Sequence, residues 1–344
     1  MTMITDLSLD LIEEILSKVS IKSLKAVKST CKEWNTLSKD ESFRKKHSTK
    51  EFPMFLNFDG YRFRKRFSLH RIHNIKDLTC IKEIAKLHIP LDLLIVNQCD
   101  GLLLCSAKGE DDSLVVWNTY LAQTRWIELR NSRIETNHQY AIGYDNSKNH
   151  KVLMLFDNHL KHEIYDFKSS SWRVLDISNP TNPKRRRKRG VSLKGNSYFV
   201  VDGKLLGFDF TREKFGPCMD LPFDSSDKFG DDGIRCSCVR GEQLAVLFQK
   251  YLYEFVIWIT TKIEPDAVSW SSFLKVDMKP FVGADHWLEV ESFFIEKEKK
   301  VAVVWGDYDY KDTCYVVGED GCYQKKTYMK DIVVSYAPSL VQIQ

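Results

Sequence analysis

No stretch of the 344-residue sequence reaches the roughly 18 consecutive apolar residues that a membrane-spanning helix needs. The N-terminus has no basic segment followed by an apolar run, so it does not predict a secretory signal. The nine cysteines are an odd number and include no C-x-x-C pair. Without a disulfide framework, they indicate free thiols in a reducing, intracellular compartment, the nucleus or the cytoplasm.

A strong excess of one charge is also missing. Lysine and arginine number 51 against 47 acidic residues, a net charge of +4. Six of the positive charges form one run, and without them the balance is 45 − 47 = −2. The chain is therefore not a general nucleic-acid or membrane binder, since its basicity is local. The run is either a solvated loop, a contact for an anion or a nuclear-import signal; it consists of Lys184, Arg185, Arg186, Arg187, Lys188 and Arg189.

Catalytic and cofactor motifs are absent from the sequence: it contains no G-x-S-x-G, P-loop, G-x-G-x-x-G or H-E-x-x-H. His70 and His73 would point to opposite faces of an extended segment, which does not favour a metal site. Cys236 and Cys238 would share one face of a strand, where buried thiols are the simpler interpretation. We therefore expect a non-enzymatic protein without a metal or cofactor.

One segment, YRFRKRF at residues 61–67, interleaves aromatic side chains with arginines, a pattern found where proteins bind single-stranded nucleic acid. Its alternation with period two more simply predicts a strand with one apolar and one cationic face. The pattern therefore does not favour nucleic acid as a partner.

The first fifty residues predict three short helices. Apolar side chains recur on one face of the first helix, at Leu11, Ile12, Ile15, Leu16 and Val19, after a possible capping box of Asp10 and Glu13. IKSLKAVKS predicts a second helix, and CKEWNTLSKD a third that begins near Thr30. A unit of about forty residues seldom folds stably alone. Its apolar surface therefore either docks on the rest of the chain or binds a separate partner.

Beyond residue 50 the sequence predicts short strands separated by turn signals such as Asp100-Gly101 and Asp202-Gly203. Strands of similar pattern are centred near Trp117, Tyr165, Phe208, Trp258 and Tyr315, at separations of 48, 43, 50 and 57 residues. Aromatic edge strands follow at Trp126, Trp172 and Trp270. A repeat of about 40 to 50 residues with four strands is typical of propeller blades. Five blades are indicated, and strands near 52–72 could pair with the C-terminal IVVSYAPSLVQI to close a sixth; an irregular sandwich is the alternative.

The N-terminal segment LSLDLIEEILSKVSIKSLKAVKSTCKEWNTLSKDESFRKKH resembles the plant F-box pattern, with D-L-x-x-E-I-L, T-C-K-x-W-N-x-L and a closing F-x-K-K-H. The resemblance implies a three-helix F-box that binds a Skp-type adaptor and, through it, a cullin-based ubiquitin ligase. The adaptor-binding residues that we expect are Leu7, Ser8, Leu11, Ile15, Leu16, Leu24, Val27, Cys31 and Trp34. Ser8 and Ser20 replace prolines that the family usually has, which leaves the two helix starts less pre-organised.

The segments CDGLLLC, VVWNTYLAQTRWI, YAIGYD, EIYDFKSSSWRVLD and FFIEKEKKVAVV are similar to the type 1 F-box-associated domain of plant F-box proteins. This second resemblance implies a kelch-like β-propeller that binds a target protein. We expect separate α and β parts, with an F-box at 1–48, a connecting segment and first strands at 49–89, and a mainly antiparallel all-β propeller at 90–344. The family defines no motif for the target-binding residues.

Together these patterns predict the substrate-recognition subunit of a Skp–cullin–F-box ubiquitin ligase, which recruits a target protein but performs no bond chemistry itself. Two alternatives stay open. One is a binding protein whose F-box no longer engages the ligase, as Ser8 and Ser20 suggest. The other is a sensor that holds a small ligand in the propeller.

Overall fold

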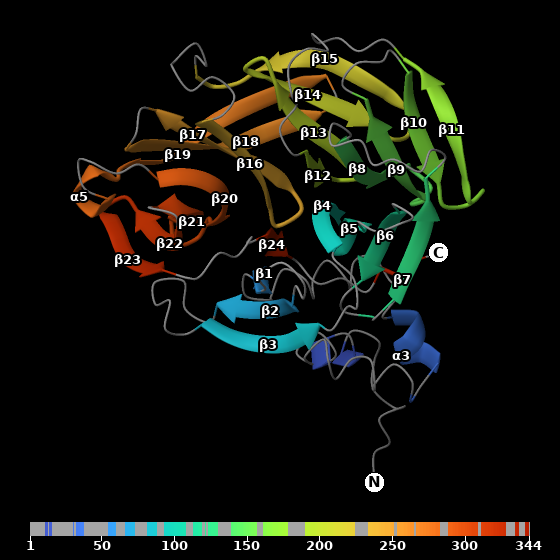
Figure 1. The fold of residues 1–344 in the computed structure, drawn as a ribbon, viewed down its shortest axis with the longest axis horizontal. Coiled ribbons are helices and arrows are strands. Elements are labelled where there is room, and N and C mark those ends of the chain that lie inside the picture. Colours follow the sequence, from blue (N-terminus) through green and yellow to red (C-terminus); the bar gives the residue numbers. More distant parts are fainter. Residues whose placement is uncertain are drawn as a thin grey trace.

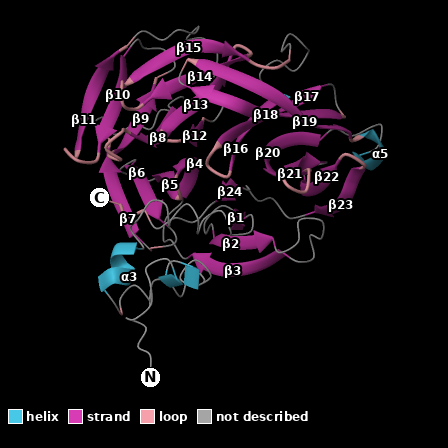
Figure 2. Cartoon of the chain, turned by 180° about the vertical axis from the view of Figure 1, so that it is seen from behind, coloured by secondary structure: helices cyan, strands magenta, loops and turns pink. Residues whose placement is uncertain are grey.

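The computed structural model describes residues 11–12, 14–15, 30, 32–37, 54–59, 66–72, 81–87, 93–107, 113–118, 121, 123–129, 139–156, 161–177, 190–223, 233–250, 253–264, 266–282, 288–308, 311–327, 334–336 and 341–343. Strand makes up most of these residues, as Figure 2 shows, and helix is found at residues 11–12 and 14–15, in α3 (Lys32–Leu37) and in α5 (Lys279–Val282). Within these ranges, no helix has the length and hydropathy to traverse a bilayer.

Six four-stranded antiparallel sheets follow one another around a common centre, as the blades of a propeller (Figure 1). We name them blades A to F in chain order, and give the strands of each from the innermost to the outermost. Blade A contains β24 (Val334–Tyr336), β1 (Met54–Asp59), β2 (Arg66–Ile72) and β3 (Ile81–Leu87). Blade B contains β4 (Leu93–Cys99), β5 (Leu102–Ala107), β6 (Ser113–Asn118) and β7 (Gln123–Glu128). Blade C contains β8 (Gln139–Tyr144), β9 (His150–Leu155), β10 (Lys161–Asp166) and β11 (Ser171–Asp176).

Blades D to F repeat the same order of strands. Blade D contains β12 (Val191–Leu193), β13 (Asn196–Val201), β14 (Lys204–Asp209) and β15 (Lys214–Asp220). Blade E contains β16 (Ile234–Val239), β17 (Gln243–Lys250), β18 (Glu254–Glu264) and β19 (Ala267–Asp277). Blade F contains β20 (Leu288–Glu296), β21 (Val301–Tyr308), β22 (Lys311–Gly318) and β23 (Gly321–Thr327).

The repeat that the sequence predicts corresponds to these blades. Its five centres, Trp117, Tyr165, Phe208, Trp258 and Tyr315, lie on β6, β10, β14, β18 and β22, the third strand of blades B to F. The aromatic edges at Trp126, Trp172 and Trp270 lie on outermost strands. The propeller is therefore confirmed, and the sandwich alternative is wrong because each repeat forms its own sheet.

Two-residue hairpins join the first two strands of blades B and D. Asp100 and Gly101 have φ values of 46° and 76°, and Lys194 and Gly195 have φ values of 52° and 84°. Positive φ at both central residues gives a turn whose twist matches that of the flanking strands. The predicted turn signal Asp100-Gly101 is therefore confirmed as the hairpin that begins blade B.

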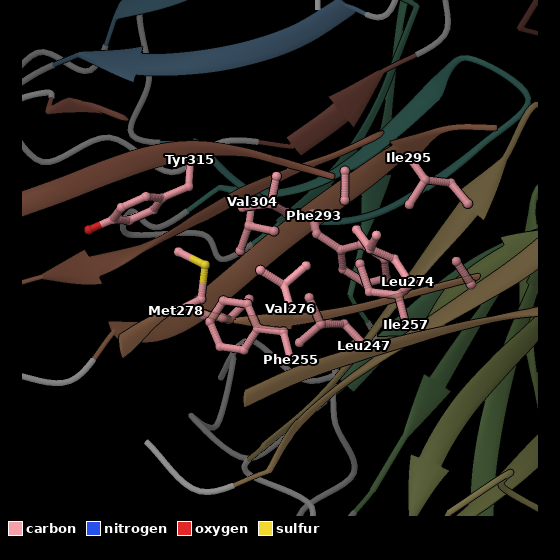
Figure 3. Packing of buried hydrophobic residues seen from close by; sticks show 14 of the residues in the cluster. Leu247, Phe255, Ile257, Leu274, Val276, Met278, Phe293, Ile295, Val304 and Tyr315 are labelled. Atoms are coloured by element: carbon pink, nitrogen blue, oxygen red, sulfur yellow. The ribbon is translucent and has the colours of Figure 1, made fainter. Parts of the chain in front are cut away.

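The hydrophobic core lies between blades rather than in the centre of the ring. Successive side chains of a strand point to opposite faces, so Leu205 on β14 packs toward blade E while Leu206 packs toward blade C. Figure 3 shows the cluster between blades E and F, where Phe255 and Ile257 face Phe293 and Val304. A middle strand is apolar on both faces for this reason, as in the fully buried β5, LLLCSA.

The ring closes where its two ends pair. The segment β24 forms an antiparallel pair with β1, with Met54 opposite Tyr336 and Leu56 opposite Val334. The sequence predicts this sixth sheet from strands near 52–72 and the C-terminal apolar run, and the pairing confirms it. Leu56 and Val334 are 334 − 56 = 278 residues apart in the sequence, so a long-range pairing completes the propeller.

Candidate interaction surfaces

The N-terminal helical residues leave apolar side chains in solvent. Leu11 and Ile15 are 43% and 45% exposed, whereas Ile12 between them is 7% exposed. Residues four apart lie on the same side of a helix, so Leu11 and Ile15 form one apolar edge. Among the described residues, the other exposed large hydrophobic side chains are Trp126 and Val174 on the propeller. The apolar edge therefore keeps nearly half of both side chains in solvent.

The third predicted helix is present as α3, and Thr30 lies in a turn just before it. Trp34 in this helix is partly buried, and the Thr36 hydroxyl donates a hydrogen bond to the Lys32 carbonyl oxygen at 3.0 Å. The remaining expected adaptor residues lie outside the described residues: Leu7, Ser8, Leu16, Leu24, Val27 and Cys31.

Two basic segments of the sequence also fall largely outside the described residues. The run from Lys184 to Arg189 lies in the connection between β11 and β12, which joins blades C and D. In YRFRKRF, β2 begins at Arg66, and residues 61–65 are not among those described.

The two faces of the ring differ in the length of their connections. The four strands of a blade alternate in direction. The turn from the first to the second strand and the turn from the third to the fourth strand therefore lie on one face of the ring. The turn from the second to the third strand and the connection to the next blade lie on the opposite face. The connections between blades B and C, C and D, D and E, and E and F hold ten, fourteen, thirteen and ten residues. All four leave the same face, which we call the connection face. Long loops on a rigid scaffold are the usual place for binding residues.

The centre of the ring is filled by side chains where the inner strands of blades B, C and D meet. The Asn97 side-chain amide donates to the Gly190 carbonyl oxygen at 3.1 Å. The Ser192 hydroxyl lies 2.6 Å from the Ile142 carbonyl oxygen and 3.1 Å from Asn97 Oδ1. Asn97 and Ser192 are buried. This part of the centre is occupied by protein groups, which favours the faces of the propeller as binding surfaces.

A partly buried ionic cluster, with Lys151 as its buried member, joins blades C and D. Lys151 Nζ lies 3.0 Å from Glu213 Oε1 and 3.0 Å from Asp145 Oδ2, and Arg173 contacts the second carboxylate oxygen of Glu213. Burial alone would lower the pKa of Lys151, but its hydrogen bonds to Glu213 and Asp145 outweigh burial and raise it. The pKa of Asp145 is lowered, because the bonds from Lys151 and from backbone amides outweigh its burial. All members are paired, so the cluster holds blades together and offers no reactive group.

The six cysteines that the structure describes are buried or partly buried thiols: Cys99, Cys105 and Cys314 are buried, and Cys218, Cys236 and Cys238 are partly buried. Burial raises the pKa of Cys105, Cys236 and Cys238 to about 12, so these thiols stay protonated at neutral pH and are poor nucleophiles and metal ligands. Cys236 and Cys238 both lie on β16 and pack against the core between blades D and E, as predicted. Across the described part of the chain, no group of three or more His, Cys, Asp or Glu side chains could hold a metal ion.

Comparison with known proteins agrees with this architecture. Residues 4–46 match the F-box domain, and residues 52–343 match the F-box associated β-propeller domain. The F-box protein At3g49510 of Arabidopsis thaliana is 42% identical over 396 residues, which cover 100% of both chains. The Arabidopsis F-box protein At3g19880 is 40% identical over 374 residues, 100% of this chain and 94% of that protein. The chain therefore belongs to the plant F-box proteins that carry an F-box associated propeller.

Several residues that hold the propeller together carry no local signal in the sequence. Arg125 on β7 donates to the Phe167 carbonyl oxygen at 2.9 Å and to Ser170 Oγ at 2.8 Å, which joins blades B and C. Arg240 pairs with Glu296 at 2.6 Å and with Glu298 at 2.7 Å, which joins blades E and F. These partners are 42 to 58 residues apart, so only the repeat itself could have indicated that they meet.

Proposed function

We propose that this protein is the substrate-recognition subunit of a Skp–cullin–F-box ubiquitin ligase. The observation that carries the proposal is the exposed apolar edge of Leu11 and Ile15, within a segment that matches the F-box domain. Fully burying a large aliphatic side chain contributes about 1.5–3 kcal/mol. Two such side chains, each nearly half exposed, would thus gain about 1 kcal/mol each from a partner that covers them.

The Skp-type adaptor is the partner that we propose for this edge. The surface would include the expected set of Leu7, Ser8, Leu11, Ile15, Leu16, Leu24, Val27, Cys31 and Trp34, on an F-box of three helices. The partial exposure of Trp34 supports a shared role in the F-box interior and at its surface. The adaptor in turn would connect the chain to a cullin.

The propeller, which we expect to be of the kelch-like type, would bind the target protein and hold it near the ligase. The connection face supports this role, because four consecutive connections of ten to fourteen residues leave it from a rigid ring. The subunit would contribute proximity rather than chemistry: holding the target near the ligase makes ubiquitin transfer effectively intramolecular. We therefore propose a non-catalytic, intracellular receptor without a cofactor.

The finer organisation of the chain is part of the proposal. The F-box would occupy residues 1–48, the connecting segment and first strands 49–89, and the remaining propeller 90–344. The pairing of β1 with β24 places the first strands in the same ring as the later blades. The run from Lys184 to Arg189 would serve as a nuclear-import signal, which import of a fluorescent fusion with and without these six charges would test.

Co-purification with a Skp-type adaptor tests the proposal. We expect the full chain to retain the adaptor and a variant without residues 1–45 to lose it, while circular dichroism shows the propeller still folded. Retention of the adaptor by the shortened, folded chain would refute the assignment.

A second candidate is an F-box protein that has lost its connection to the ligase, and Ser8 and Ser20 in place of proline favour it. The double variant Ser8→Pro, Ser20→Pro separates the two. A large gain in adaptor affinity would indicate an F-box weakened by the missing prolines, whereas unchanged affinity would indicate that serine caps these helices adequately.

A further inference from the structure

A short segment that follows β24 lies on a different blade. Val341 and Ile343 are partly buried against the hydrophobic cluster between blades B and C, and Gln342 between them is exposed. Alternation of buried and exposed side chains with period two is what an extended segment produces on a surface. Figures 1 and 2 both place the C-terminal end of the chain beside β7 of blade B. We call residues 341–343 the strap.

Side-chain amides of blade B bind the backbone of the strap. The Asn118 Nδ2 group donates to the Val341 carbonyl oxygen at 2.7 Å, and the Ile343 backbone amide donates to Gln123 Oε1 at 3.1 Å. Asn118 is fully buried, and its Oδ1 accepts a hydrogen bond from the Leu121 amide at 3.0 Å. The turn that follows β6 therefore fixes the orientation of Asn118 independently of the strap. This corner of blade B is a built site for an extended peptide.

The strap helps to hold the ring closed, because the strand pairing that closes the ring is short. Strand β24 is only three residues long, and its three register pairs with β1 are what join blade A into a ring. The strap begins five residues after β24 and reaches the cluster between blades B and C. It thus extends the closure from blade A across to the next two blades.

We propose that the corner of blade B formed by Asn118 and Gln123 is a peptide-binding site whose resident ligand is the chain's own segment 341–343. Two backbone contacts and two β-branched side chains at alternate positions define what the site accepts. When the strap occupies the site, it closes the propeller at a second place, in addition to the pairing of β24 with β1. The affinity comes from the Val341 and Ile343 side chains, while the amides set the register.

The test uses the full chain truncated after Leu340 and a synthetic peptide of residues 337–344 added in trans. We expect truncation to lower the thermal midpoint by on the order of 5 °C, and millimolar peptide to restore it in a saturable way. The control peptide carries Val341→Ser and Ile343→Ser and should restore nothing. An unchanged midpoint after truncation, equal rescue by both peptides, or no rescue by either would overturn the proposal.

If the truncated chain fails to fold, two full-length variants give the answer instead. Ile343→Ser removes an apolar contact of the strap, and Gln342→Ser alters its exposed position. We expect faster hydrogen exchange in β7 for the first variant and unchanged exchange for the second. Equal exchange in the two variants would show that the strap does not hold blade B.

Discussion

The indole nitrogen of Trp172, on the outermost strand of blade C, donates a hydrogen bond to the Glu128 carbonyl oxygen at the end of the outermost strand of blade B, 2.7 Å away. The same relationship recurs two blades later, where Trp270 donates to the Asp220 carbonyl oxygen at 3.1 Å. In both cases a tryptophan of one blade binds the last residue of the outer strand of the preceding blade. Two of the three aromatic edges, Trp172 and Trp270, are therefore contacts between blades.

The first prediction concerns this contact. Trp172→Phe keeps most of the ring and removes the donor, so we expect the free energy of unfolding to fall by about 1 kcal/mol. Trp172→Ala also leaves a cavity and should cost about 3–5 kcal/mol. Trp126→Phe is the matched control, because Trp126 occupies the outer strand of blade B but is 50% exposed. Chemical denaturation measures all three, and equal effects at Trp172 and Trp126 would contradict the assignment.

A second prediction separates backbone conformation from close packing at two glycines. Gly195 and Gly241 have φ values of 84° and 70°. A Cβ at Gly195 would lie 2.6 Å from the Tyr144 ring and 2.7 Å from the Tyr144 carbonyl oxygen, whereas a Cβ at Gly241 would meet nothing within 4 Å. Gly241→Ala should cost about 1 kcal/mol for the left-handed conformation. Gly195→Ala should add about 1–3 kcal/mol for the overlap with blade C.

Thermal unfolding of the two variants checks this difference. A Gly195→Ala variant as stable as Gly241→Ala would mean that blades C and D do not approach so closely at this turn.

A third prediction addresses the ionic cluster between blades C and D. Lys151→Met removes a cation whose side chain is 7% exposed and leaves Asp145 and Glu213 without it, so we expect a loss of about 3–5 kcal/mol. Lys204→Met breaks an exposed pair with Asp220 on the same propeller, and we expect no measurable change. Urea denaturation of the two variants tests whether the cluster stabilises the fold. Similar midpoints for the two variants would show that it does not.

A fourth prediction is a pH dependence that arises from His150. Burial, reinforced by the charge of Lys148, lowers the pKa of this histidine from 6.5 to about 4, and its ring packs against Tyr144 and Phe167. Between these two values the unfolded chain binds a proton that the folded chain does not. Stability is therefore complete above pH 6.5 and falls as the pH approaches 4, by about 3 kcal/mol at 1.36 kcal/mol per unit.

The variant His150→Gln isolates this contribution. We expect its stability to decline less between pH 6.5 and pH 4 than that of the unaltered protein, whatever its stability at pH 7. The carboxyl groups of Asp145 and Asp166, whose pKa values are lowered from 3.8, lose their contribution at lower pH and should affect both proteins alike. Parallel pH profiles for the two proteins would rule out His150 as the source.

The blades were predictable from the sequence because each blade forms from strands that follow one another along the chain. Each blade is a run of strands, and the centres at Trp117 and Tyr165 recur since adjacent residues of these third strands are buried on both faces. Contacts between blades were not predictable in the same way. Lys151 and Glu213 are 62 residues apart, and nothing near either residue indicates the other.

Trp126 shows that the burial of a side chain on an outer strand was also not predictable from the sequence. It lies on an outer strand, as Trp172 and Trp270 do, yet its side chain is half exposed while Trp172 is buried. The burial of a side chain on an outer strand depends on the preceding blade, which the local sequence does not describe. For the proposed adaptor surface, the helical period predicted that Leu11 and Ile15 share a face, but only the structure shows that both side chains keep nearly half of their surface in solvent.

The affinity of a purified Skp-type adaptor for the full-length chain tests the central claim most directly. Leu11→Asp with Ile15→Asp places charge on the apolar edge, while Val174→Asp alters a side chain of similar exposure, 45%, on β11 of the propeller. By isothermal titration calorimetry we expect the first variant to bind the adaptor at least about tenfold more weakly, a difference of about 1.4 kcal/mol, and Val174→Asp to bind like the unaltered protein. Equal affinity in all three proteins would contradict the claim that this edge is the adaptor-binding surface.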